Sequence, residues 1–259
     1  MKIARYRIDQ DTTYGVLTED GQLKRLRGSP YESLETTDQV DALDDVRLLA
    51  PVEAPRVFGA GLNYVSHIAE AGQKTPEIPM LFMKPTTAVI GPDDEIVYPT
   101  GSTVVHFEGE LTAIIGRKAR HLSEDDALDA VLGYTCGNDV SERTVQFAEM
   151  AMGTMLVGKS FDTFCPIGPI IATGLDPTNL ELEARLNGER RQHINTSDLL
   201  FSVAQLVAYL SRAMTLLPGD VLLTGTPAGV GPVAPGDMVE IEIGGIGVLR
   251  NSVVAESTG

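Results

Sequence analysis

Alternating apolar and polar residues run through much of the chain, and this period of two predicts β-strands. Near the N-terminus the pattern appears in three short stretches, KIARYRI, TYGVLTE and QLKRLRG, which are joined by turns. Two later stretches predict hairpins, one turning at Asn187-Gly188 and the other at Gly244-Gly245. We therefore expect a small β-rich N-terminal domain over residues 1–52 and a larger domain over residues 53–259, with a boundary near residues 50–56.

Helical spacing of apolar residues is confined to a few segments. Residues 197–220, SDLLFSVAQLVAYLSRAMTLLPGD, show it most clearly and predict a helix that ends at Pro218-Gly219. Ser123 is expected to cap a shorter helix in SEDDALDAVLG, and SERTVQFAEM predicts another. Because strands far outnumber helices, the sequence favours the α+β class over a doubly wound parallel sheet.

Composition narrows the function classes. The 259 residues include 36 acidic and 20 basic side chains, so the formal net charge is −16. Such a chain repels phosphate backbones, and nucleic acid is not an expected partner. No apolar stretch approaches the ~18 residues of a membrane span. Cys136 and Cys165 lack metal-ligand spacing and no signal peptide opens the chain, so we expect a reduced, cytoplasmic protein.

The segment VVHFEGELTAIIG carries the first candidate chemistry. If it forms one strand, His106, Glu108 and Glu110 point to the same face, and Gly109 leaves access between the two carboxylates. Adjacent carboxylates repel each other unless a cation offsets their charge, and their oxygens suit Mg²⁺, Mn²⁺ or Ca²⁺. The alternative is the solvated face of a surface strand.

Asp139 is the expected third ligand of such an ion. It follows the apolar strand AVLGYTCGN and precedes the helix predicted in SERTVQFAEM. Junctions between elements often carry functional residues, because the backbone there is free to turn toward a ligand. His106 is expected either close to this metal site or simply packed, whereas His121 and His193 are expected to be structural or on the surface.

A candidate acid–base pair lies in FGAGLNYVSHIAEAG. His67 and Glu70 are three residues apart, so a helical turn would place Glu70 where it can orient the imidazole. An ordinary helix salt bridge is the alternative interpretation. The adjoining residues 68–78 contain Gly and Pro, and we expect them to form a lid over the site.

Other polar residues are candidates for binding an anionic substrate. Lys159 lies in GKSFDTFCPIGP, where it is either a binding group or a solvent-facing lysine. Arg143 and Gln146 are three residues apart on a predicted helix, so both can face one cavity. In PGDVLLTGTPAGVGP, the free amides of a Gly-rich loop and Thr226 are suited to an anionic oxygen. That loop lacks the GK[ST] of a nucleotide-binding P-loop.

Taken in order, these segments resemble the fumarylacetoacetate hydrolase family. The resemblance runs from FGAGLNY at residue 58 to IGVLRNSVV near the C-terminus. Its pieces are NYxxHxxE at 63–70, MLFMKP at 80–85, ExE at 108–110, GYTCGNDVSERTVQ at 133–146, GKSFDTFCPIGP at 158–169 and LLTGTPAGVG at 222–231. Any one piece is weak evidence, but six in register are specific.

The resemblance implies a mixed β-roll of several sheets, a homodimer and a bound Mg²⁺, with Mn²⁺ or Ca²⁺ as alternatives. It implies three sets of residues: metal ligands Glu108, Glu110 and Asp139; catalytic residues His67, Glu70 and Lys159; substrate-binding residues Arg143, Gln146, Thr226, Gly225 and Asn63. The pair His67 and Glu70 resembles the acylpyruvate hydrolase branch, and the chain also resembles the 2-hydroxyhepta-2,4-diene-1,7-dioate isomerase-decarboxylase branch.

The function implied by this resemblance is metal-dependent hydrolysis of a C–C bond in a small 2-oxo or diketo acid. Decarboxylation or isomerisation of a 2-oxo acid, such as oxaloacetate or an aromatic-degradation intermediate, is the alternative, and a non-catalytic oxo-acid binder is a remote one. One segment departs from many relatives, since AMGTMLVGKSF is uncharged and rich in Met before Lys159. We expect Met152, Met155 and Leu156 to line an apolar end of the pocket, which suggests one anionic group fewer on the substrate.

Overall fold

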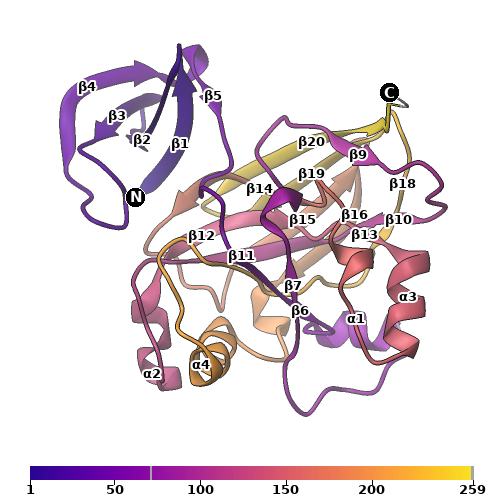
Figure 1. The fold of residues 1–259 in the computed structure, drawn as a ribbon. Helices are drawn as coiled ribbons and strands as arrows, with labels where there is room; N and C mark the ends of the chain where they lie inside the picture. Colours follow the sequence, from indigo (N-terminus) through magenta and orange to yellow (C-terminus); the bar gives the residue numbers. More distant parts are fainter. Residues whose placement is uncertain (71, 258–259) are drawn as a thin grey trace.

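The computed structural model describes residues 1–70 and 72–257. Within them the chain forms three sheets and a few short helices (Figure 1), which confirms the α+β class and the several sheets. None of the helices in this part of the chain has the length and apolar character needed to cross a membrane.

The N-terminal strands form one end of the largest sheet and lie to one side of the molecule in Figure 1. They are β1 (Lys2–Ile8), β2 (Asp11–Leu17), β3 (Gln22–Leu26), β4 (Thr36–Ala42) and β5 (Arg47–Leu48). The first three were predicted, whereas β4 was missed because it is an edge strand with few apolar residues. β1 pairs antiparallel with β14 (Cys165–Ala172), and the domain boundary near residues 50–56 stays a prediction.

The rest of the largest sheet surrounds the fully buried strand β11 (Gly109–Ile115). Its other members are β12 (Val131–Asn138), β17 (Val221–Leu223), β6 (Val57–Gly61), β7 (Met80–Lys84) and β8 (Val89–Ile90). β12 and β17 pair with β11 on its two sides. Because both edges of β11 are hydrogen-bonded to neighbouring strands, β11 is a rigid support for the residues at its N-terminal end.

Both predicted hairpins are confirmed and belong to a second sheet. It contains β15 (Glu181–Leu186), β16 (Glu189–Asn195), β19 (Met238–Ile243), β20 (Gly247–Ala255) and β9 (Ile96–Tyr98). Asn187 and Gly188 both have positive φ, 54° and 79°, as the mirror-image turn of a two-residue hairpin requires. β19 and β20 pack against β12, and β20 also against β14, so the apolar core lies between the two large sheets.

The segment VVHFEGELTAIIG is two strands, which corrects the expectation of one. β10 (Val105–Phe107) joins β13 (Ser141–Glu142) and β18 (Gly231–Val233) in a three-stranded sheet, whereas β11 belongs to the largest sheet. The chain changes sheets at Glu108, whose backbone N–H donates to the Asn138 side chain and whose carbonyl accepts from the Asp139 N–H. The break therefore places Glu108 beside Asp139.

Four α-helices occur among the described residues: α1 (Val65–Glu70), α2 (Glu124–Ala127), α3 (Arg143–Ala151) and α4 (Val203–Ala213). Ser123 caps α2 as expected. The helix predicted to reach Pro218-Gly219 ends at Ala213, which corrects its length. The cause is an antiparallel bridge, because Leu216 and Ala119 exchange backbone hydrogen bonds and so draw the chain into an extended conformation.

A capping box begins α4. The Ser202 hydroxyl accepts from the Gln205 N–H, and the Gln205 side chain accepts from the Ser202 N–H. Replacing the cap by alanine leaves an amide of the first turn without its partner. We expect Ser202→Ala to lower the free energy of unfolding by about 1 kcal/mol in urea denaturation, whereas Ser202→Asp stays within a few tenths of the wild type. Equal stability of Ser202→Ala and wild type would contradict this role.

Candidate active site

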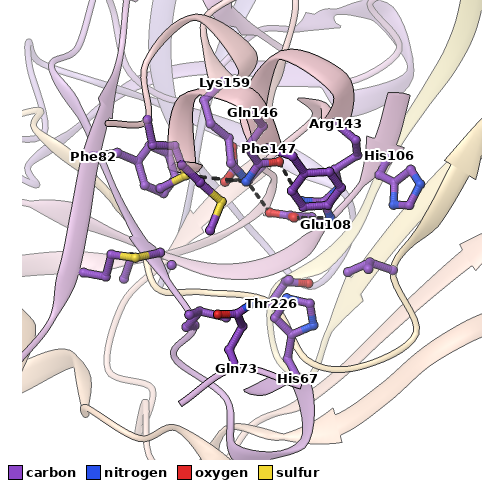
Figure 2. A pocket seen from close by; sticks show the side chains of 18 of the residues that line it. His67, Gln73, Phe82, His106, Glu108, Arg143, Gln146, Phe147, Lys159 and Thr226 are labelled. Carbon is purple, nitrogen blue, oxygen red and sulfur yellow. Dashed lines mark hydrogen bonds and ion pairs between the residues drawn. The ribbon is translucent and has the colours of Figure 1, made fainter. Parts of the chain in front are cut away.

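A cavity of about 260 Å³ opens where β6, β7 and β11 meet α1 and α3. Figure 2 shows polar side chains from distant parts of the chain gathered on it. Of the residues expected in the site, these line the cavity: His67, Glu70, Glu108, Glu110, Asp139, Arg143, Gln146, Lys159 and Thr226. His106 lines it too, so the three residues expected on one strand face do share a cavity despite the break between β10 and β11.

Three buried carboxylates form the centre of the site. Glu108, Glu110 and Asp139 each offer an oxygen, and these oxygens lie within 4.8 Å of one another. The register of β11 against β12 pairs Gly109 with Asn138, which brings the next residue, Asp139, against Glu108. Glu110 accepts a hydrogen bond from the Gly225 N–H, at 2.6 Å.

Three buried cations face these carboxylates. Lys159 Nζ contacts Glu108 Oε2, at 2.7 Å, and Asp139 Oδ2. Arg143 Nη2 lies 2.6 Å from Glu108 Oε1, and Lys84 Nζ contacts Asp139 Oδ1. The formal charges of the six groups therefore balance, which offsets part of the cost of burying them.

The balance is uneven within the cluster. Burial would raise the pKa of Glu108, but Lys159 and Arg143 outweigh it and hold that pKa below its ordinary value. The pKa of Glu110 is raised well above its ordinary value by burial and by the charges of Asp139 and Glu108. A buried carboxylate between two like charges is the environment that a hard divalent cation relieves, and the all-oxygen donor set fits Mg²⁺, Mn²⁺ or Ca²⁺.

The pair formed by His67 and Glu70 lies on α1, at the edge of the cavity. His67 Nδ1 is 3.2 Å from Glu70 Oε2, and the Glu70 carboxylate also accepts from the Gly229 N–H. Glu70 is therefore held from two sides and fixes the orientation of the imidazole. Because Nδ1 faces Glu70, Nε2 is the ring nitrogen left for a proton transfer.

Helix α3 positions Arg143 and Gln146. Arg143 Nη1 donates to Gln146 Oε1 at 2.7 Å, as their spacing of three residues allows. Gly158 lies directly against this helix, since a Cβ there would come within 2.6 Å of the Gln146 backbone nitrogen. That close approach brings the next residue, Lys159, into the site.

Glu149 fixes the loop that precedes Lys159. Its carboxylate accepts from the backbone N–H groups of Leu156, Val157 and Gly158 at 3.1, 2.8 and 3.0 Å. Burial would raise the pKa of Glu149, but these three donors outweigh it and lower that pKa. No sequence motif marked Glu149, because its partners are backbone amides.

Three residues expected in the site have other contacts. Asn63 lies outside the cavity lining, where its side chain donates to the carbonyls of Phe201 and Thr224 and accepts from the Phe201 N–H. The Gly225 amide holds Glu110 and is not free for a substrate. Thr226 does line the cavity, although its hydroxyl donates to the Gly109 carbonyl.

Sequence reasoning missed several lining residues. Met80, Phe82 and Lys84 are two residues apart on β7 and therefore share one face of the strand. The side chains of Met80 and Phe82 line the cavity, and Lys84 contacts Asp139. This period of two is the signal that marks them. Phe147, Met150, Gln73, Leu62 and Val230 also line the cavity.

The expected apolar end is only partly right. Met155 lines the cavity, but Met152 is 76% exposed and Leu156 lies in a separate groove beside Met83. Met80 and Met150 contribute instead. The expected lid over residues 68–78 includes Ala71, which lies outside the described residues, and the lid stays a prediction.

The remaining histidines differ in environment. Burial and the nearby Arg143 lower the pKa of His106 to about 4, so this cavity-lining imidazole is neutral near pH 7. His193 lies on the surface 3.2 Å from Glu181, and His121 is exposed.

Two family models match the chain. One, described as "Fumarylacetoacetate (FAA) hydrolase C-terminal", matches residues 56–254, and another, "Rv2993c-like, N-terminal", matches residues 1–51. Protein Rv2993c of Mycobacterium tuberculosis is 46% identical over 245 residues, which cover 93% of this chain and 91% of that protein. The mitochondrial oxaloacetate tautomerase fahd2 of Xenopus laevis is 40% identical over 233 residues, which cover 86% of this chain and 73% of that protein.

Solved structures extend the similarity over nearly the whole chain. A 5-carboxymethyl-2-hydroxymuconate delta-isomerase from Mycobacterium smegmatis has a TM-score of 0.92 and 43% identity, with 99% of this chain and 100% of that chain covered. Maleylpyruvate hydrolase from Sphingobium sp. SYK-6, in complex with manganese (II) ion and pyruvate, has a TM-score of 0.82 and 31% identity over the same shares.

The contacts of Glu149 predict a pH-dependent contribution to stability. Its pKa is lower in the folded chain than in the unfolded chain, so the unfolded chain binds the proton first as pH falls. The stabilisation is therefore present above the ordinary carboxyl pKa and disappears as pH falls through the folded-state value. We expect Glu149→Gln to lower the free energy of unfolding by about 2 kcal/mol at pH 7 and by less in acid.

Urea denaturation of both proteins between pH 3 and pH 7 measures this difference. Glu19→Gln, at an exposed residue, is the matched control and should change little at any pH. A difference between wild type and Glu149→Gln that stays constant with pH would contradict the assignment.

Proposed function

The chain belongs to the fumarylacetoacetate hydrolase family, and from that premise we propose that it is a divalent-metal-dependent enzyme that hydrolyses a C–C bond in a small 2-oxo or diketo acid. The observation that carries the proposal is the convergence of three buried carboxylates with a histidine–carboxylate pair on one cavity. Family membership makes action on oxo acids the expectation, and the geometry favours hydrolysis within it.

Glu108, Glu110 and Asp139 would hold the ion. A divalent cation there supplies Lewis-acid polarisation of a keto oxygen and offsets the charge of an enolate. Mg²⁺ is the proposed ion, with Mn²⁺ or Ca²⁺ as alternatives. The presence of manganese with pyruvate in the related maleylpyruvate hydrolase supports a site for an ion and a 2-oxo acid here.

The chain's own residues account for the remaining chemistry. His67 takes a proton from water through Nε2, while Glu70 keeps the ring oriented and stabilises its charged form. The activated water adds to the carbonyl distal to the carboxylate, and the C–C bond breaks with its electron pair moving toward the 2-oxo group. The products are a carboxylic acid and the enolate of a shorter 2-oxo acid, which then takes up a proton.

Lys159 and Arg143 supply positive charge beside the developing enolate. Both contact Glu108, so they lie against the proposed ion site and offset the negative field of this acidic chain. Gln146 and Thr226 face the same cavity as neutral hydrogen-bonding groups. We also propose that the protein is a cytoplasmic homodimer that binds neither nucleic acid nor a membrane.

Tautomerisation, isomerisation or decarboxylation of a 2-oxo acid is the second candidate. The same His67 and Glu70 can move a proton between carbon and oxygen without an attacking water. The 40% identity to an oxaloacetate tautomerase favours this alternative. Product analysis separates the two, because hydrolysis of acetylpyruvate yields acetate and pyruvate, whereas a tautomerase changes only the keto–enol ratio of oxaloacetate.

We expect His67→Ala to lower kcat for acetylpyruvate hydrolysis by about 10²- to 10⁴-fold, because the variant lacks the base that activates water. Circular dichroism checks that the variant is folded. His193→Ala is the matched control, since that histidine is half-exposed and outside the cavity, and it should keep full activity. Retention of hydrolysis in folded His67→Ala would exclude the proposed base.

Removal of divalent ions tests the metal. We expect EDTA to abolish turnover of acetylpyruvate, and Mg²⁺ or Mn²⁺ to restore it after the chelator is removed. The ordered sheet should stay folded without the ion, because Lys84, Lys159 and Arg143 balance the carboxylates. Full turnover in a chelated, metal-free sample would contradict the metal's role.

A further inference from the structure

The wall of the cavity beyond Lys159 is apolar. Met80, Phe82, Met150 and Met155 line it, and Lys159 Nζ lies 5.1 Å from the centre of the Phe82 ring. In Figure 2 Phe82 and His106 lie on opposite sides of Glu108. A substrate held at the carboxylates can therefore extend a tail along methionine and phenylalanine side chains.

The permanent cations of the cavity are already paired with its carboxylates. Among the described residues these are Lys159 and Arg143, and both contact Glu108. The apolar wall itself has no described lysine or arginine. A carboxylate at the tail of a substrate would meet no free cation there, since the polar group beside Met155 is the neutral Gln146 amide, and an unpaired buried charge is costly.

The charge of the whole cluster also disfavours a second carboxylate on the substrate. Three carboxylates face Lys84, Lys159 and Arg143, so the formal charges of the cluster sum to zero when all three carboxylates are ionised. A divalent cation together with the enolate of a monocarboxylic 2-oxo acid, which carries two negative charges, keeps it neutral. A second carboxylate would leave one negative charge in excess.

From the apolar wall and this charge balance we infer that the substrate has one carboxylate, at the 2-oxo end, and an uncharged apolar acyl tail that packs against Met80, Met150 and Met155. This inference rests on the proposed function and narrows it to acylpyruvates with alkyl or aryl tails. Met150 determines specificity, since it lies on α3 in the wall and takes no part in the ion pairs of the charged cluster.

Binding of inert analogues tests the inference without turnover. Oxalate, N-butyl oxamate and N-(3-carboxypropyl) oxamate share the chelating end and differ in the tail, and the last two have nearly the same shape. Titration calorimetry with Mn²⁺-loaded protein measures each Kd. Each oxamate carries one negative charge less than the corresponding enolate, so charge balance alone would favour the carboxypropyl compound and the comparison isolates the apolar wall. We expect N-butyl oxamate to bind at least tenfold more tightly than N-(3-carboxypropyl) oxamate, since a buried methyl group is worth about fourfold and the carboxylate in its place is unpaired.

Equal or tighter binding of the carboxypropyl compound, with oxalate binding normally, would overturn the inference and leave the proposed function intact. Failure of oxalate itself to bind would overturn both.

We further expect Met150→Lys to reverse the preference between the two oxamates, whereas the uncharged control Met150→Gln keeps it. Reversal by Met150→Gln as well would show that charge is not the determinant and would overturn the inference.

Discussion

The site depends on three buried carboxylates held together by three buried cations. Glu108, Glu110 and Asp139 repel one another, and the contacts of Lys159 and Arg143 lower the free energy of this arrangement on the Glu108 side. Glu110 receives much less compensation, as the raised pKa of its carboxyl shows. The least compensated charge of the cluster is therefore at Glu110, beside the proposed site of the cation.

The surrounding fold serves this cluster by fixing polar groups through backbone contacts. The change of sheet at Glu108 turns that carboxylate toward Asp139, and the Gly225 amide holds Glu110. Glu149 holds the loop before Lys159 by three amides, and Gly229 holds Glu70. These contacts orient the carboxylates from a second element of the fold, which is the arrangement that precise proton transfer and charge stabilisation require.

Sequence alone predicted the features that depend on local spacing. The hairpin at Asn187-Gly188 and the approach of His67 to Glu70 involve residues close in the chain, and both occur. The proximity of Glu108, Glu110 and Asp139 was predicted from strand alternation together with the family resemblance.

The predictions that were wrong concern features that depend on contacts between residues far apart in the chain. A bridge to Ala119 ends α4 early, and a change of sheet breaks the strand at Glu108. Asn63 lies outside the cavity lining because its amide donates to Phe201 and Thr224, far away in the chain, and its predicted role in substrate binding stays a prediction. Glu149 left no signal at all, since backbone amides carry no sequence information.

The most direct measurement is the anomalous diffraction of a crystal grown with Mn²⁺ and oxalate. We predict one strong manganese peak per chain, within about 2.0–2.3 Å of oxygens from Glu108, Glu110 and Asp139, with oxalate completing the coordination. No peak there, with Lys159 and Arg143 still closed onto the carboxylates, or a peak bound by other residues, would contradict the proposed metal site.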